Sequence, residues 1–131
     1  MHILYFYFKY HIMNTLFKVI AIVFGILFFV SAALQYNDPD PTVWMIIWGL
    51  AGVISLGFAL NRIPSIVPLV AGVLALGGFF YMYPEKFEGF EIGQGDIKNI
   101  EEAREAFGLL IISIVMLLLA FRGWMLRKSK I

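Results

Sequence analysis

The sequence contains no cysteine among its 131 residues, and this absence excludes whole classes of chemistry. Disulfide bridges, thiol redox reactions and zinc sites built on cysteine all need the missing side chain. Histidine is almost as rare, because only His2 and His11 occur, with no acidic residue beside either of them. A metal site that rests on histidine is therefore not expected.

Charge is scarce as well. Only 15% of the residues are charged and the formal net charge is +1, so the chain lacks the basic excess that is typical of nucleic-acid binding. In place of charge, 61% of the residues are hydrophobic and 17% are aromatic, a composition typical of membrane proteins. We therefore expect the lipid bilayer as a partner, and no nucleic acid.

Four apolar runs are long enough to cross a hydrocarbon core of about 30 Å, which takes roughly 20 residues of helix. They extend over residues 16–35, 42–60, 64–83 and 106–121. Each run is predicted to be helical, because lipid offers no hydrogen bonds to an open backbone. The expected fold is an all-α, polytopic membrane four-helix bundle within residues 13–131, with a longer extracytoplasmic loop between the third and fourth helices.

The distribution of basic residues predicts the orientation of the chain. The side shared by both termini and the turn at 61–63 carries Lys9, Lys18, Arg62, Arg122, Arg127, Lys128 and Lys130. The opposite side carries Lys86, Lys98 and Arg104. Because basic residues accumulate in cytoplasmic segments, we expect both termini in the cytoplasm and a multi-pass location, in the plasma or inner membrane if the source is bacterial.

Residues 1–12 precede the first span and are rich in aromatic residues. No small-residue cleavage pattern follows them, so a cleaved signal peptide is not expected. Two interpretations stay open for this segment. It is either an interfacial element at the membrane surface or the product of a mis-assigned start, since Met13 begins a natural N-terminus of its own.

Polar side chains gather in two segments of the chain. All nine acidic residues lie either within 35–41 or between Glu85 and Glu105. In a chain with four spans these two segments emerge on the same side of the membrane, away from both termini. Any ligand or partner is therefore expected on that polar face.

Seven residues of this face form the candidate polar cluster. Some of them follow the first span directly, and the others share one face of the last helix through spacings of three and four residues. The cluster consists of Gln35, Asn37, Asp38, Asp40, Glu101, Arg104 and Glu105.

Two helix starts border the cluster. Asp40 is expected to cap the second span with its carboxylate, while Pro41 takes the first helical position, where no N–H is needed. Asn99, followed by Glu102, resembles a capping box for the last helix, and Asp96 is a second candidate cap. From either start the last helix is expected to continue into the fourth span without a break.

Two motifs of the polar face resemble a known family. The motifs are QYNDPD at 35–40 followed by Trp44, and EEARE at 101–105 followed by Gly108 and Leu109. This combination is similar to the transmembrane protein 220 family, and the resemblance extends over residues 13–121. It implies a small four-helix membrane protein and supplies no substrate, because the family has no assigned biochemical activity.

Three interpretations of the polar cluster stay open, and the first is a structural lock. An arginine near hydrocarbon needs a partner. Arg104 is then expected to pair with Asp38 or Glu101 and to fasten the first connection to the last helix. The cluster would in that case hold the bundle together rather than bind anything.

In the second interpretation the cluster binds a ligand. Asp38, Asp40, Glu101 and Glu105 carry the oxygen atoms that Ca²⁺ or Mg²⁺ prefers. Alternatively, Arg104 receives an anionic lipid headgroup or solute. Apart from such an ion, no cofactor is expected.

In the third interpretation two carboxylates act as general acid and base. No nucleophile, histidine or cofactor motif near the cluster supports such an enzyme. We therefore expect an integral membrane protein with a non-catalytic role, which binds a ligand or contacts a partner through its polar face. A second copy of the chain and another membrane protein are the partners left open.

Overall fold

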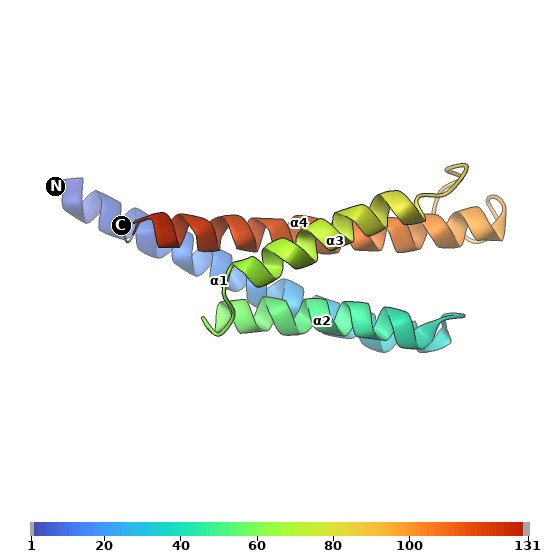
Figure 1. Cartoon of the computed structure of the whole chain (residues 1–131), viewed down its shortest axis with the longest axis horizontal. Coiled ribbons are helices and arrows are strands. Elements are labelled where there is room, and N and C mark those ends of the chain that lie inside the picture. The colour runs from blue at the N-terminus through green and yellow to red at the C-terminus, as the bar shows by residue number, and fades with distance from the viewer. Residues whose placement is uncertain (1, 130–131) are drawn as a thin grey trace.

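A computed structural model describes residues 2–129, and every regular element in that range is helical (Figure 1). Helix α1 covers His2–Leu34 and is followed by a short 3₁₀ helix, η1, at Gln35–Asn37. Helices α2, α3 and α4 cover Pro41–Ala59, Ile66–Met82 and Ile97–Ser129. The all-α class predicted from the sequence is confirmed.

Some of the predictions fall outside this description. Met1 and residues 130–131 are not part of it, and neither are the side chains of residues 6, 9–12 and 129. The predicted roles of the Lys9, His11 and Lys130 side chains therefore lie outside the described residues.

The four α-helices form two antiparallel pairs. Helix α1 packs along α2 and α3 packs along α4, whereas the two pairs touch each other over a much smaller area. Both chain ends lie at one end of the molecule, and the α1–α2 and α3–α4 connections lie at the other, which we call the loop end (Figure 1). The two acidic segments of the sequence therefore meet at the loop end.

Within residues 2–129, three helical segments contain an apolar stretch long enough to cross a membrane, namely Met13–Asn37, Pro41–Ala59 and Ile97–Lys128. Helix α3 is also apolar but has only 17 residues. At about 1.5 Å per residue it extends roughly 26 Å, a little less than the thickness of a hydrocarbon core. It ends before the predicted residue 83 because Tyr83 is extended, as the residue before a proline usually is.

Helices α1 and α4 have 33 residues each and are longer than the spans predicted within them. Residues 2–12 continue α1 without a break instead of forming a separate element. Helix α4 begins nine residues before the apolar run that starts at Ala106, so its first turns are polar and project beyond the apolar segment. The predicted continuity of the last helix into the fourth span is confirmed.

Small residues allow the helices within each pair to approach closely. Ala51, Ser55 and Ala59 recur every four residues on α2, and all three are buried. On α3, a methyl group added to Gly72 would lie 2.8 Å from the side chain of Leu117 on α4. The carbonyl oxygen of Gly72 also accepts a buried hydrogen bond of 2.8 Å from the Ser113 hydroxyl. This bond joins α3 to α4 inside the apolar core.

Candidate functional site

A cavity of about 440 Å³ opens at the loop end, between the α1–α2 connection and the first turns of α4. Six of the seven residues of the predicted polar cluster line it, namely Gln35, Asn37, Asp38, Glu101, Arg104 and Glu105. The seventh, Asp40, is exposed and is not among the lining residues. The structure therefore brings together side chains that lie more than 60 positions apart in the sequence.

The first wall of the cavity is the connection between α1 and α2. Gln35 continues the helical path, because its side-chain amide donates a hydrogen bond of 3.0 Å to the carbonyl oxygen of Ser31. Asp38 then turns the chain, since its Oδ1 accepts the backbone N–H of Asp40 at 2.9 Å. This turn fixes the position of the Asp38 carboxylate at the cavity.

The predicted capping role of Asp40 is wrong in one respect. Asp40 does occupy the N-cap position of α2, with Pro41 at the first helical position as expected. Its side chain makes no capping hydrogen bond, however, because its backbone N–H is held by Asp38 in an extended turn. The carboxylate of Asp40 stays in solvent beside the cavity.

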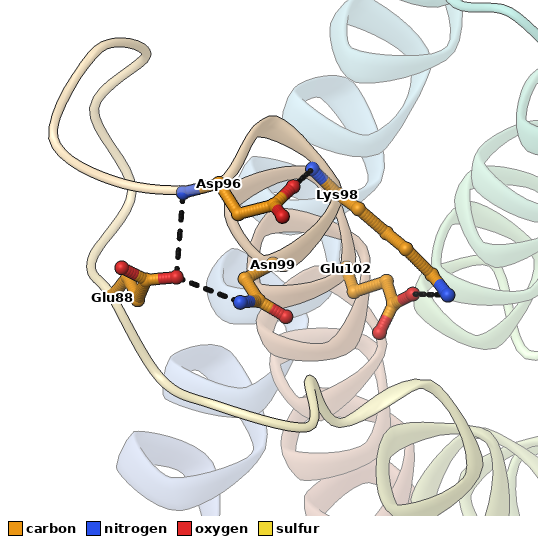
Figure 2. Close-up of polar contacts among 5 residues, drawn as sticks. All are labelled: Glu88, Asp96, Lys98, Asn99 and Glu102. Carbon is orange, nitrogen blue, oxygen red and sulfur yellow. Dashed lines mark hydrogen bonds and ion pairs between the residues drawn. The ribbon is translucent and has the colours of Figure 1, made fainter.

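The second wall is the start of α4, which the 83–96 loop holds in place (Figure 2). The Asp96 carboxylate accepts the backbone N–H of Lys98 at 3.0 Å and so caps the helix. Glu88 accepts the backbone N–H of Asp96 at 3.3 Å and the side-chain amide of Asn99 at 2.7 Å. Of the two candidate caps, Asp96 is the one that acts. Asn99 lies inside the first turn and binds the loop instead.

These contacts lower the pKa of Glu88. The hydrogen bond from the Asn99 amide has the largest effect and the one from the Asp96 backbone N–H the next largest, and together they hold the pKa of Glu88 below its ordinary value of 4.5. A salt bridge of 3.9 Å between Lys98 and Glu102 joins successive turns of α4 (Figure 2). Exposed pairs of this kind contribute little, so the loop contacts matter more for the position of the helix start.

Arg104 does not form the predicted lock. Its Nε–H donates a hydrogen bond of 2.6 Å to the carbonyl oxygen of Phe90 in the loop. Among the described residues, no ion pair joins Arg104 to Asp38 or to Glu101. The guanidinium thus has a neutral partner, because the loop folds back over α4 and presents a backbone acceptor that sequence reasoning could not place.

An aromatic cluster holds that part of the loop against the helices. The Phe90 ring packs edge-on against Phe107 of α4, with 5.2 Å between the ring centroids, and also against Phe87 at 5.4 Å. Phe107 in turn contacts Phe79 of α3 at 5.4 Å. The loop is therefore an ordered wall beside the cavity, and its Ile92 is one of the lining residues.

Two tryptophans of α2 complete the lining. Trp44 is only 7% exposed. Trp48 packs against Phe28 of α1, with 5.8 Å between the ring centroids, and over Gly108 of α4. A methyl group at Gly108 would lie 2.9 Å from the Trp48 ring, so glycine makes room for that ring. Sequence reasoning missed Trp48, although its spacing of four from Trp44 places both rings on one helix face.

Glu105 has the most unusual environment in the cavity. It immediately precedes the apolar run of α4 and therefore stands just outside the segment that would cross the membrane. Burial, above all, raises the pKa of Glu105 to about 7, and the nearby carboxylates of Asp38 and Glu101 act in the same direction. A positive charge in the cavity would relieve this repulsion.

The arrangement does not favour a metal ion. Among the described residues, no group of three or more acidic or histidine side chains is close enough together to hold one. The four candidate ligands Asp38, Asp40, Glu101 and Glu105 are divided between two walls, and Asp40 stays outside the cavity. A site wide enough for an organic group fits this geometry better than the short distances of about 2.0–2.6 Å that Ca²⁺ or Mg²⁺ requires.

Comparisons with known proteins identify the family of the chain. Residues 27–121 match the family model described as "Transmembrane family 220, helix". The chain is 32% identical over 124 residues to the transmembrane protein 220 of Xenopus laevis, an alignment that covers 82% of this chain and 56% of that protein. The chain thus spans little more than half the length of that relative. No solved structure matches the chain. With the family resemblance confirmed, we conclude that the chain belongs to transmembrane family 220.

Proposed function

We propose that this protein crosses the membrane four times with both termini in the cytoplasm, and that it binds a small cationic ligand in its loop-end cavity without catalysing a reaction. The sizes of the helices support four spans, because α3 lies within the length range of about 17–25 residues for crossing helices. The excess of basic residues on the terminal side supports the orientation.

The charge of the cavity lining supports a cationic ligand and is the observation that carries the proposal. Asp38, Glu101 and Glu105 contribute three carboxylates, against the single guanidinium of Arg104. Burial and the nearby carboxylates raise the pKa of Glu105, so a positive charge beside its ionised form would be favourable. A ligand with an ammonium group would supply it, and the rings of Trp44 and Trp48 would add favourable cation–π contact.

The lining also supports binding rather than catalysis. It contains no serine, threonine, lysine or histidine, so nucleophiles of these four types are missing from the lining. Glu105 could exchange a proton near neutral pH, but no nucleophile–base pair of the Ser–His or Cys–His kind lies beside it. Recognition of a charged group needs only the carboxylates and the aromatic surface that are present.

A fluorescence titration with ethanolamine tests the proposal. The chain has three tryptophans, and replacing Trp124 by Phe leaves Trp44 and Trp48 as reporters at the cavity. We expect a saturable change when ethanolamine is added to the purified protein at constant ionic strength. Glu101→Gln with Glu105→Gln should weaken the affinity at least about tenfold, since each tenfold step corresponds to about 1.4 kcal/mol.

Glu85→Gln is the matched control, because Glu85 is an exposed loop carboxylate that does not line the cavity. It should leave the affinity unchanged. A signal that does not saturate, or one that the control weakens as much as the cavity variants do, would reject the proposed function.

A further inference from the structure

A second hollow lies in the apolar part of the molecule. This groove has a volume of about 360 Å³, and α2, α3 and α4 all contribute to its walls. Its lining is hydrophobic throughout and includes Ala51 of α2, Ala71 and Leu74 of α3, and Leu109 and Met116 of α4. The groove lies where the two helix pairs touch each other least.

The groove begins one helical turn away from the cavity. On α4, Glu105 lines the cavity and Leu109, four residues later, lines the groove. On α2, Trp48 lines the cavity while its neighbour Ile47 lines the groove. Four residues of helix correspond to about 6 Å, so a single extended molecule can reach from one hollow into the other.

The groove opens towards the surrounding membrane. Leu74 and Leu50, which both line it, are 70% and 56% exposed. Both residues lie within helices whose composition suits hydrocarbon surroundings, well inside the polar ends. A lipid chain can therefore enter this groove from the side that faces the membrane. A water-soluble ligand would gain little there, because the apolar lining favours apolar groups.

Arg104 offers further hydrogen-bond donors beside the carboxylates of the cavity. Arg104 uses its Nε for Phe90, which leaves its terminal nitrogens available for an anionic oxygen. The ligand should thus carry acceptor oxygens as well as an ammonium group.

We infer that one aminophospholipid occupies both hollows, with its ammonium group among the carboxylates, its phosphate at Arg104, and one acyl chain in the groove. The inference rests on the proposed function, because it names the class of cationic ligand that the cavity binds. Its two charged groups match the mixed lining, in which three carboxylates surround one guanidinium. The place of the cavity beside the first residue of the apolar run matches the depth of a lipid headgroup.

The test compares the same headgroup with and without acyl chains. Glycerophosphoethanolamine and a short-chain phosphatidylethanolamine are titrated separately into the purified protein with the Trp124→Phe background. We expect the lipid to bind at least about tenfold more tightly than the soluble headgroup, since the burial of acyl methylene groups in the groove is favourable. Phosphatidylglycerol, which lacks the ammonium group, should bind more weakly than phosphatidylethanolamine.

A groove variant separates the acyl chain from the headgroup. Ala71→Phe places a ring inside the groove, and Val73→Phe is its matched control on the outward face of α3, with 56% exposure at Val73. Ala71→Phe should abolish the advantage of the lipid over the soluble headgroup but leave binding of the headgroup intact. Val73→Phe should change neither. Retained headgroup binding also shows that the variant is folded.

Each failure has its own pattern. If neither compound binds the wild-type protein although ethanolamine does, only this inference is rejected; if ethanolamine does not bind either, the proposed function is rejected with it. If the soluble headgroup binds but the acyl chains add nothing, only the inference is rejected. Equal binding of phosphatidylglycerol, or an unchanged lipid advantage in a folded Ala71→Phe protein, would also overturn it.

Discussion

The Nε–H of Arg104 donates a hydrogen bond of 2.6 Å to the carbonyl oxygen of Phe90, and this contact ties the 83–96 loop to α4. An arginine at this position could have paired with Asp38 across the cavity, but the structure gives it a backbone partner. The guanidinium is therefore held at the rim by the loop, and the carboxylates of the cavity stay available to a ligand.

This contact makes the effects of Arg104 and Asp38 on stability independent. Arg104→Gln should lower the free energy of unfolding by about 1 kcal/mol, the usual contribution of one hydrogen bond. Asp38→Asn should add its own small cost, and the double variant should show the sum within about 0.5 kcal/mol. Chemical unfolding in detergent measures all three. A strong coupling between the two sites would instead support the ion pair between Arg104 and Asp38 that the first interpretation of the sequence predicts.

Trp48 and Gly108 offer a second prediction, because the added methyl group of Gly108→Ala would lie 2.9 Å from the Trp48 ring. Displacement of the ring should cost about 1–3 kcal/mol, as overpacking does, and should change the tryptophan fluorescence. Gly77→Ala is the matched control, since nothing lies within 4 Å of a methyl group there. It should be neutral or slightly stabilising. Equal effects of the two changes would contradict the close contact.

The pKa of Glu105 predicts a dependence of stability on pH. The group faces Asp38 and Asp40 of the α1–α2 connection, and Glu101 and Glu102 of its own helix. Its pKa rises from 4.5 to about 7 on folding, so the folded state binds the proton more tightly than the unfolded chain. The contribution of the group is thus most favourable below pH 4.5 and is lost as the pH rises to about 7.

Unfolding experiments between pH 5 and 8 measure this effect. Because the carboxylate is partly open to solvent, we expect a difference of about 1 kcal/mol rather than the full value of the shift. Glu105→Gln should remove that part of the slope, and Glu85→Gln should keep it. An identical slope in wild type and Glu105→Gln would show that Glu105 titrates normally.

The proposed topology can be tested with single cysteines, since the chain has none of its own. Gln94 lies in the 83–96 loop and Arg62 in the α2–α3 turn, and both are exposed. Gln94 is preferable to Gly93, whose φ of +100° would strain a cysteine. In intact cells an impermeant thiol reagent should label Gln94→Cys and leave Arg62→Cys unlabelled. Labelling of both would mean that α3 does not span.

Much of the architecture could be predicted because it depends on the composition of the chain and on the length and order of its apolar and acidic segments. The long apolar runs predict helices, and the two acidic segments must meet if consecutive helices are antiparallel. The same reasoning places six cluster residues at one cavity, from Gln35 to Glu105. These are properties of individual segments, and lipid leaves the backbone no alternative to the helix.

The details that could not be predicted depend on contacts between segments. Asp40 and Asn99 both have the right residue type for a cap, but the fold of the 83–96 loop and the Asp38 turn decide which side chain acts. The partner of Arg104 is a backbone carbonyl, and no residue type marks it in the sequence. The packing of Trp48 over Gly108 likewise appears only when α2 and α4 are brought together.

The most direct test of the central claim is to locate the bound ammonium group. Solid-state NMR can measure dipolar coupling between ¹⁵N-labelled ethanolamine lipid and the ¹³C-labelled carboxyl carbons of the glutamates in the membrane-embedded protein. We predict a contact within about 4 Å, the range of an ion pair, whose signal disappears when Glu101→Gln and Glu105→Gln are combined and persists in Glu85→Gln. No contact at all, or a contact that survives the combined Glu101→Gln and Glu105→Gln changes, would contradict the assignment of the cavity as a cation-binding site.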